Sequence, residues 1–298
     1  MFTSPPVEYI EPVFRPPSEA NSLILQVTNG CSWNECTFCE MYTAPQKKFR
    51  PKAQHDIEDE LKRCSAVLGG VRRVFLADGD AMALSYKRLE SILKAIRQYL
   101  PSVSRVSAYC LPRNLKNKSV DELSELNRLG LNLLYVGAES GNNYVLGAVN
   151  KGETLESTSE ALIKIRQGGI KSSVMIINGL GGVVHSEQHA IDSARLVNEV
   201  QPDYLATLVL YFQQSDKRLL ESFPDFRMPS QRQLIEEMKV FISHLQLERT
   251  IFRSDHASNY LVLKGVLNKD KDKLLKMIDA ALQRDSSVFL RSESARGL

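Results

Sequence analysis

The sequence lacks several features, and each lack argues against a class of protein. No apolar run approaches the roughly 20 residues that a membrane-spanning helix needs. The net charge of +3 on 298 residues is too small to favour nucleic acid or an anionic membrane as the main partner. Residues 1–17 are rich in proline and lack the basic start and apolar run of a signal peptide. We therefore expect a soluble, cytoplasmic protein.

Cysteine is also scarce, and its distribution is uneven. The chain has five cysteines, three of them crowded together: Cys31, Cys36, Cys39, Cys64 and Cys110. An odd number with such crowding is a poor disulfide framework and a better metal site.

Short apolar or β-branched runs alternate with amphipathic helix patterns over much of the chain. We expect strands at 23–28, 73–77, 106–110, 133–136, 172–177 and 205–210. Helices are expected at about 56–68, 85–100, from Ser119 onward, 154–167 and 186–200, with a Ser119/Glu122 capping box and Cys64 on an apolar face. This alternation predicts parallel βα units, and so an α/β fold, a partial (β/α)6 TIM-like barrel.

After Tyr211 the alternation stops. Helices are expected at 230–245, with a Ser230/Gln233 capping box, and at 269–284, on either side of an irregular or extended segment, 252–264. No Gly/Ser-rich linker precedes them. We therefore expect an N-terminal extended segment (1–21), a core barrel (22–213) and a C-terminal α-rich extension packed on the barrel (214–298).

Four segments rich in polar residues or glycine follow predicted strands: 29–41, 78–81, 137–142 and 178–182. In barrels of this class, chemistry collects on the loops that leave the C-terminal ends of the strands. The sequence therefore predicts that these segments share one pocket.

The first of them reads Cys31-Ser-Trp-Asn-Glu-Cys36-Thr-Phe-Cys39. Three thiolates within nine residues can hold three corners of a cubane iron–sulfur cluster. The fourth iron then has no protein ligand nearby in sequence, which leaves a position for a substrate or cofactor. The alternative is a zinc-stabilised binding protein, although a structural zinc site needs four ligands and the loop has no histidine.

With Phe38 as the aromatic residue before the last cysteine, this loop resembles the signature of the radical S-adenosylmethionine (SAM) superfamily. It departs from that signature in one respect, since four residues separate Cys31 from Cys36 where the family has three. The segment from Gly137 to Gly141 (Gly-Ala-Glu-Ser-Gly), with Asn150-Lys151-Gly152 further on, is similar to the coproporphyrinogen oxidase-like and methylthiotransferase-like branches. The resemblance covers about residues 22–213.

The resemblance implies a [4Fe–4S] cluster on the three cysteines and SAM as the second cofactor. It places Asp78, Gly79 and Asp80 at the amino group of SAM, Glu139 and Ser140 at the SAM pocket, Asn178 and Gly179 beside adenosine, and Tyr211 against adenine. For Glu139, a salt bridge to Arg113 or Lys171 is the alternative, because a buried charge needs a partner.

The reaction implied is reductive cleavage of SAM to methionine and a 5′-deoxyadenosyl radical, which abstracts hydrogen from a small molecule or a cofactor precursor. A non-catalytic protein similar to haem chaperones is the alternative within this resemblance. The electron donor would be a flavodoxin or ferredoxin. Lys47, Lys48, Arg50 and Lys52 form either its docking patch or an ordinary solvated loop.

The segment from Arg253 to Tyr260 (Arg-Ser-Asp-His-Ala-Ser-Asn-Tyr) is rich in polar and ionisable groups. We expect either a lid that presents His256 to a substrate as acid, base or hydrogen-bond donor, or a polar turn. From the third strand, Tyr109 and Arg113 are expected to face the pocket. Tyr109 alternates with Cys110, so one of the two points inward.

Overall fold

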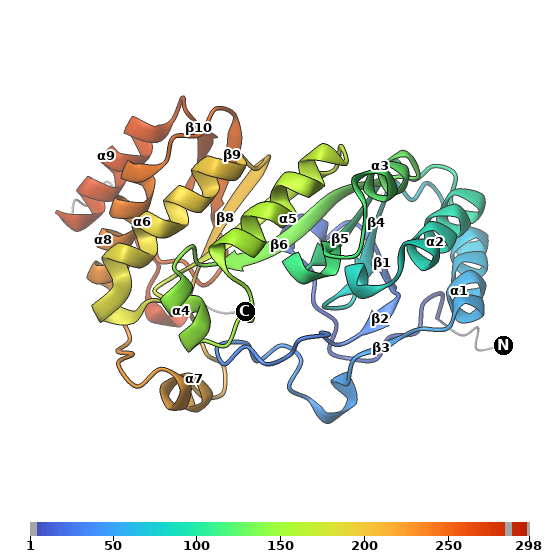
Figure 1. Ribbon diagram of the computed structural model, residues 1–298, viewed down its shortest axis with the longest axis horizontal. Coiled ribbons are helices and arrows are strands. Elements are labelled where there is room, and N and C mark those ends of the chain that lie inside the picture. Colours follow the sequence, from blue (N-terminus) through green and yellow to red (C-terminus); the bar gives the residue numbers. More distant parts are fainter. Residues whose placement is uncertain (1–4, 284–287, 297–298) are drawn as a thin grey trace. The chain divides into compact units, whose positions relative to one another are not determined.

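The structure is a computed structural model that describes residues 5–283 and 288–296. Its main sheet has the strand order β1-β4-β5-β6-β7-β8-β9-β10 (Figure 1). The bounds are β1 Leu23–Gln26, β4 Arg73–Ala77, β5 Arg105–Cys110, β6 Leu131–Glu139, β7 Lys171–Asn178, β8 Tyr204–Val209, β9 Thr250–Ser254 and β10 Leu263–Leu267. A separate small sheet pairs β2 (Thr28–Asn29) with β3 (Arg50–Pro51).

Helices connect the parallel strands. They are α1 Gln54–Val67, α2 Tyr86–Tyr99, α3 Val120–Arg128, α4 Asn143–Ala148, α5 Leu155–Gln167, α6 Gly182–Val200, α7 Lys217–Ser222, α8 Gln231–His244 and α9 Lys271–Leu282. The capping boxes expected at Ser119 and Ser230 are both formed. The α/β class with parallel βα units is confirmed.

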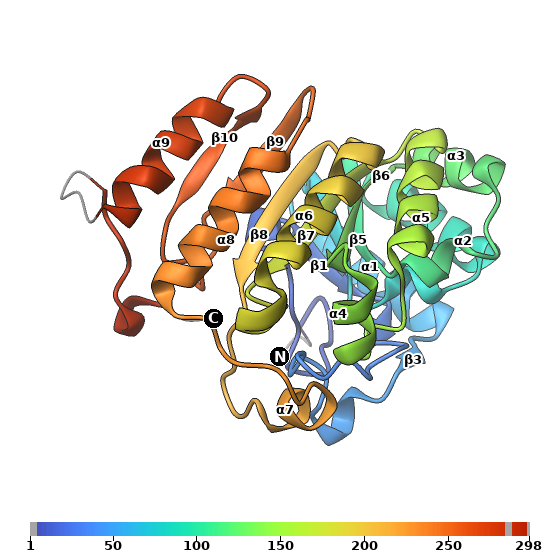
Figure 2. The ribbon, with the colours of Figure 1, turned by 60° about the vertical axis from the view of Figure 1, so that its left-hand side comes forward.

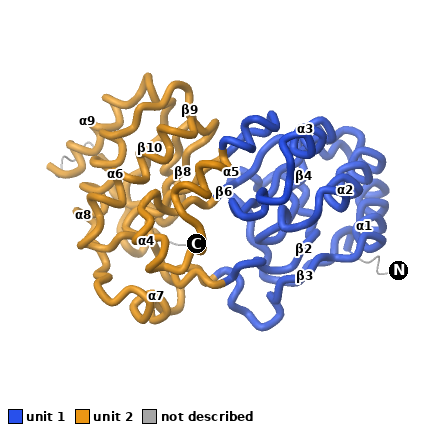
Figure 3. The backbone as a smooth tube through the Cα atoms, in the orientation of Figure 1, with its two compact units in different colours: residues 1–34, 41–136, 163–172 blue, residues 35–40, 137–162, 173–298 orange. Residues whose placement is uncertain are grey.

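The chain divides into two compact units (Figure 3). Unit 1 comprises residues 1–34, 41–136 and 163–172. Unit 2 comprises residues 35–40, 137–162 and 173–298.

In unit 1, β1 pairs with β4, β4 with β5, and β5 with β6, all in parallel. Helix α1 packs against α2, and α2 against α3, beside these strands. Leu25, Phe75, Leu76 and Leu134 are fully buried. Their strands are almost continuously apolar because both faces of a parallel sheet are covered.

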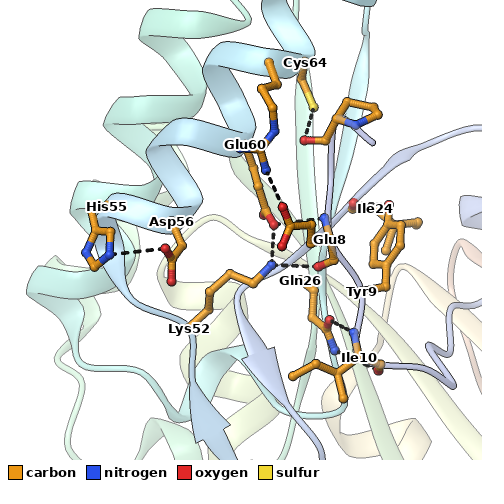
Figure 4. A network of polar contacts seen from close by, with 12 residues as sticks. Glu8, Tyr9, Ile10, Ile24, Gln26, Lys52, His55, Asp56, Glu60 and Cys64 are labelled. Atoms are coloured by element: carbon orange, nitrogen blue, oxygen red, sulfur yellow. Dashed lines mark hydrogen bonds and ion pairs between the residues drawn. The ribbon is translucent and has the colours of Figure 1, made fainter. Parts of the chain in front are cut away.

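Polar contacts fix the chain before β1 to this unit (Figure 4). The Glu8 amide donates to Glu60 Oε1 at 3.0 Å, and the Tyr9 hydroxyl donates to the Ile24 carbonyl at 2.8 Å. Cys64 is fully buried on α1, so its predicted place in the core is confirmed.

In unit 2, β7 pairs with β8 and β8 with β9 in parallel, whereas β10 is antiparallel to β9. Figure 2 shows α6, α8 and α9 side by side along β8, β9 and β10. The sequence of β8, α8 and β9 is therefore one more parallel βα unit, beyond the point where we expected the alternation to stop. β9 has only five residues, and Arg253 within it is exposed, so its apolar pattern is weak.

Within the described part of the chain, no helix is long enough and apolar enough to cross a membrane.

Candidate active site

The first half of the cysteine loop belongs to unit 1 and is fixed by contacts within it. Gly30 has φ +68°, and a Cβ there would lie 2.1 Å from the carbonyl oxygen of Lys47, so only glycine fits this crossing of the chain. The Ser32 hydroxyl donates to the Asp80 carboxylate. The Arg113 guanidinium lies 3.9 Å from the centre of the Trp33 ring. These contacts hold the backbone on both sides of Cys31.

The second half of the loop belongs to unit 2 and is held in the same way. The Thr37 amide donates to the Val149 carbonyl at 3.0 Å, and Arg218 Nη1 donates to the Cys39 carbonyl at 3.1 Å. The Glu40 carboxylate accepts the backbone amides of residues 213, 214 and 215 at 2.8, 3.3 and 3.0 Å. Cys36 and Cys39 therefore lie on an anchored backbone.

Phe38 was expected at the cofactor. It packs against an apolar cluster in unit 2, whose buried members are Val145, Val149, Leu180, Leu210, Leu219, Phe223 and Phe226. Phe38 lies between Cys36 and Cys39 in the sequence, so its packing attaches this part of the loop to the core of unit 2. Phe38's contact with the cofactor remains a prediction.

Cys31, Cys36 and Cys39 are each partly exposed, whereas Cys64 and Cys110 are buried. Thiolates are the ligands that iron–sulfur clusters take, so the donor type suits the group. Among residues 5–283 and 288–296, no three Cys, His, Asp or Glu side chains are grouped as a metal site requires. The assignment of the three cysteines as ligands remains a prediction.

After β4, Asp78 is fully buried and forms an ion pair with Lys47, whose Nζ lies 2.5 Å from Asp78 Oδ2. Burial raises the pKa of the Asp78 carboxyl, and the hydrogen bond and charge of Lys47 act against this rise. Lys47 also donates to the Ile10 carbonyl at 2.7 Å. Lys47 therefore does not belong to an exposed docking patch, which corrects our prediction, because Asp78 needs its charge inside the unit.

The rest of the predicted patch is also divided. Lys52 is paired with Glu60 at 2.6 Å, while Lys48 and Arg50 are exposed.

The turn after Asp78 is closely packed. A Cβ on Gly79 would lie 2.5 Å from the Tyr42 ring, so glycine lets this ring approach the backbone. Asp80 is fully buried and also accepts from the Asn114 amide at 3.3 Å; burial raises the pKa of its carboxyl. The expected contacts of these residues with an amino group remain predictions.

Glu139, at the end of β6, adopts a left-handed backbone with φ +66°, which is strained for a residue other than glycine. Its Oε1 accepts from Lys151 Nζ at 3.0 Å, and both side chains are almost buried. A Cβ on Gly137 would lie 2.0 Å from the same oxygen, so glycine makes room for the pair. The partner of Glu139 is thus Lys151, which neither of our alternatives named.

The next residue, Ser140, is fully buried, and its hydroxyl is occupied within the protein. It accepts from the Asn142 amide at 2.9 Å and lies 2.7 Å from His189 Nδ1 on α6. The opposite ring nitrogen, Nε2, lies 3.0 Å from the Ile177 carbonyl at the end of β7. Sequence reasoning missed His189; its only signal was an ionisable side chain among small and apolar positions of a helix.

Asn178 and Gly179 end β7 and contact α8. The Asn178 side-chain amide donates to the Leu234 carbonyl at 3.0 Å, and the Gly179 amide donates to Glu237 Oε1 at 2.6 Å. Ser186 donates to the other oxygen of Glu237 at 2.5 Å. Sequence reasoning missed Glu237 too, although it falls on the apolar stripe of α8.

Burial shifts both of these hidden ionisable groups toward their neutral forms. It lowers the pKa of His189 to about 4. It raises the pKa of Glu237 to about 7, against the lowering effect of the hydrogen bonds from Ser186 and Gly179. The 3.7 Å contact between the two side chains is therefore not an ion pair at neutral pH, because His189 is uncharged.

In unit 1, Tyr109 is half-buried and Cys110 buried. The Tyr109 ring meets Phe75 edge to face at 5.1 Å and Tyr135 at 6.1 Å. Its aromatic body is thus part of the packing of the sheet, and its role toward a substrate remains a prediction, as does that of Arg113.

The polar segment from Arg253 to Tyr260 begins with the last two residues of β9 and continues as a turn. His256 Nδ1 accepts from the Ser258 amide at 3.1 Å and lies 2.9 Å from the Ser258 hydroxyl. The carbonyls of the turn accept from two arginines, Arg291 to residues 256 and 259 and Arg296 to residue 258. Burial lowers the pKa of His256, and the positive charge of Arg291 lowers it further.

Tyr211 lies in the same unit. The Arg296 guanidinium is 5.6 Å from its ring centre and 3.8 Å from that of Tyr260. One face of the tyrosine therefore has a protein cation near it. The contact expected with adenine remains a prediction.

Comparisons with known proteins bear on the part of the chain that holds the cysteine loop and the turns after β4, β6 and β7. The family model described as the radical SAM superfamily matches residues 25–194. No curated protein sequence matches significantly.

Among solved structures, coproporphyrinogen III oxidase (HemN) from Escherichia coli superposes with a TM-score of 0.56 at 20% identity, over 74% of this chain and 51% of that one. Methylornithine synthase (PylB) superposes with a TM-score of 0.52 at 15% identity, over 92% of this chain and 83% of that one. The methyltransferase TsrM from Kitasatospora setae superposes with a TM-score of 0.51 at 18% identity, over 63% of this chain and 36% of that one. The chain thus spans about a third of TsrM and half of HemN, and these likenesses show the fold.

Replacement of Lys47 by methionine should lower the free energy of unfolding by about 3–5 kcal/mol, because the Asp78 carboxyl would be left buried without its partner. The double variant Lys47→Met/Asp78→Asn should lose clearly less. Urea denaturation followed by circular dichroism measures both. Equal losses in the two variants would show that the charge pairing is not what matters.

The pair His189 and Glu237 should make opposite contributions to the pH dependence of stability. His189, with its pKa lowered from 6.5 to about 4, costs stability as the pH falls through this window, since the unfolded chain binds the proton first. Glu237, with its pKa raised from 4.5 to about 7, costs stability as the pH rises through its own window. Each effect reaches about 3 kcal/mol.

We therefore expect Glu237→Gln to gain stability relative to the wild type between pH 4.5 and 7, and His189→Gln to gain between pH 6.5 and 4. Denaturation curves at half-unit pH intervals measure these differences. Parallel curves for both variants and the wild type would contradict the assignment.

Proposed function

Because the chain belongs to the radical SAM superfamily, we propose that it is an enzyme that cleaves SAM reductively at a [4Fe–4S] cluster and acts on a small molecule or cofactor precursor. The observation that carries this proposal is the three-cysteine loop, which lies inside the matched region, 25–194. The shortage of further exposed cysteines supports it, since Cys64 and Cys110 are buried.

Cys31, Cys36 and Cys39 would hold the cluster, and three thiolates for four irons leave one iron for SAM. When bound, the cluster supplies the electron that splits SAM into methionine and a 5′-deoxyadenosyl radical, which abstracts hydrogen from the substrate. The protein contributes a fixed loop: contacts of Ser32 and Thr37 hold the backbone between the cysteines. An anchored backbone limits how much of the loop must still be ordered when the cluster binds.

Glu139 is the residue that we assign to SAM with the strongest support. Backbone strain of this kind costs on the order of 1–3 kcal/mol and clusters at ligand sites. Lys151 donates to Oε1 and holds the carboxylate in place. Oε2 then serves as an acceptor for hydroxyl or ammonium donors of SAM, because a carboxylate has two acceptor oxygens.

The remaining SAM contacts are proposed from the strand ends. The turn Asp78-Gly79-Asp80 would receive the amino group, Asn178 and Gly179 would lie along adenosine, and Tyr211 would stack on adenine. Ser140 supports this pocket from behind, since its hydroxyl is bonded to His189 and Asn142.

For the substrate, we propose His256 as a hydrogen-bond donor. Because its Nδ1 accepts from the Ser258 amide, the proton of the neutral ring is on Nε2. Burial lowers the pKa of His256 and so favours the neutral ring. Tyr109 and Arg113 are proposed as further substrate contacts. A flavodoxin or ferredoxin in the cytoplasm would supply electrons, with Lys48 and Arg50 as the exposed part of its docking patch.

The decisive experiment is anaerobic reconstitution with iron and sulfide, followed by dithionite and SAM. Formation of 5′-deoxyadenosine supports the proposal. Haem binding without consumption of SAM would favour a haem chaperone, and colourless protein with zinc and no iron would favour a zinc-stabilised binding protein.

Cys36→Ala should abolish formation of 5′-deoxyadenosine and lower the iron content, because the cluster loses one of its three ligands. Cys64→Ala is the matched control, since it removes a buried thiol and should keep both. Iron analysis and product chromatography measure the two properties. Wild-type turnover by Cys36→Ala would rule out its role as a ligand.

Glu139→Gln should raise the Kd for SAM about tenfold, which corresponds to about 1.4 kcal/mol. A charged acceptor is lost while the shape is kept, and bonds to charged groups are worth about 1.5–3 kcal/mol. Equilibrium dialysis with labelled SAM measures the change, and Glu156→Gln, an exposed carboxylate on α5, is the control. Unchanged affinity in Glu139→Gln would refute the contact.

A further inference from the structure

Two buried ionisable side chains, His189 on α6 and Glu237 on α8, lie behind the turns that follow β6 and β7. We propose that they are positioning residues, which hold these two turns in the shape that binds SAM. This inference rests on the function proposed above. It assigns a role to two residues on helices, outside the strand-end turns, and neither needs to touch the reactants.

His189 links the ends of two strands. Its Nε2 faces the Ile177 carbonyl at 3.0 Å, and a carbonyl only accepts, so Nε2 carries the proton. The neutral ring then accepts at Nδ1 from the Ser140 hydroxyl at 2.7 Å, while that hydroxyl accepts from the Asn142 amide at 2.9 Å. One tautomer therefore orients the turn after Glu139 with respect to the end of β7.

Glu237 fixes the second turn. Its two oxygens accept from the Gly179 amide at 2.6 Å and from the Ser186 hydroxyl at 2.5 Å. Glu237 is 4% exposed, so both bonds are made in a dry environment where an unbonded carboxylate would be costly. It thereby ties the glycine turn to α8 and to the start of α6.

The backbone is closely packed against a helix at both turns. A Cβ on Gly141 would lie 2.2 Å from the Asp192 carbonyl oxygen on α6, and a Cβ on Gly179 would lie 2.6 Å from the Leu234 side chain on α8. Gly179 also has φ +90°. Because the turns touch the helices directly, the orientation of the helix side chains is passed on to the turns.

A merely structural role is a poor explanation for these two residues. Apolar side chains of similar size in the same place would avoid the desolvation of an imidazole and a carboxylate, and such exchanges are often neutral or stabilising. Apolar side chains cannot hold the Ser140 hydroxyl and the Gly179 amide in one orientation, because they form no hydrogen bonds. Polar residues are therefore expected here if the orientation of the two turns matters.

The test compares variants of the cluster-loaded, full-length protein. Glu237→Leu removes both acceptors, and Glu237→Gln keeps an acceptor for Gly179 and a donor for Ser186. His189→Phe keeps the ring without its nitrogens. Ser140→Ala and the double variant Ser140→Ala/His189→Phe complete a cycle.

Asn198→Ala is the matched control. Asn198 also joins α6 to the chain around the end of α8, through the His244 carbonyl at 2.8 Å and the Gln246 amide at 2.6 Å. It lies nine residues after His189, about 13 Å further along the helix. Its loss weakens the same helix pair far from the turns.

We expect Glu237→Leu and His189→Phe to raise the Kd for SAM at least tenfold in equilibrium dialysis. Glu237→Gln should stay within about threefold of the wild type, and the double variant should bind no worse than His189→Phe. Asn198→Ala should lower the Tm without changing the Kd. In ¹⁵N NMR, His189 should show a protonated Nε2 and an unprotonated Nδ1 at pH 7.

The inference is overturned if Glu237→Leu and His189→Phe bind SAM as the wild type does, if Glu237→Gln is as weak as Glu237→Leu, or if Asn198→Ala weakens binding equally. The opposite tautomer of His189 would overturn it as well. Wild-type protein that carries a cluster and binds no SAM would instead refute the proposed function, which separates the two failures.

Discussion

The burial of charge at the carboxyl ends of parallel strands is the constraint on which the rest of this structure depends. Asp78, Glu139 and the Glu237 carboxylate behind Gly179 all lie where strands end, and each has a partner inside its own unit. An unpaired carboxylate there would be costly, so the fold must supply a lysine or a pair of donors for each one. These partners come from the loops and helices that follow the strands in the chain.

A consequence is that the strand-end turns are crowded. Gly79 lies against the Tyr42 ring, Gly137 against the Glu139–Lys151 pair, and Gly141 against the backbone of α6. These glycines are needed for space more than for unusual dihedral angles, since the tyrosine ring, the ion pair and the helix occupy the places where a Cβ would be. Packing of this kind fixes the turns before any cofactor binds. Such preorganisation reduces the conformational entropy that is lost when a ligand binds.

The cysteine loop is held by the same means. Ser32 and Trp33 are fixed within unit 1, and Thr37 and Phe38 within unit 2, so the backbone is anchored next to each cysteine. The loop has one residue more than the family signature, and Asn34 takes a left-handed conformation that asparagine tolerates well. Asn34 lies among the four residues that separate Cys31 from Cys36.

From the sequence alone, the alternation of apolar runs and amphipathic patterns determined the α/β class, most of the strands and the order of the strand-end motifs. It also placed Cys31, Cys36 and Cys39 within nine residues of one another, because local spacing is a property of the chain itself; their role as ligands of one cluster remains a prediction. The pattern missed the helices α4 and α7 and gave only an irregular or extended segment where β9 ends and β10 begins, because an element of five or six residues carries too few positions to show a period.

Only the tertiary structure decided which charges meet. Lys47 looked like part of an exposed basic run, and it is the buried partner of Asp78 from 31 positions later in the chain. Glu237 interrupts the apolar stripe of α8 because its carboxylate accepts a hydrogen bond from the Gly179 amide, 58 positions earlier. Pairs so far apart in sequence leave no periodic trace, since their contact depends on how loops and helices fold back over the sheet.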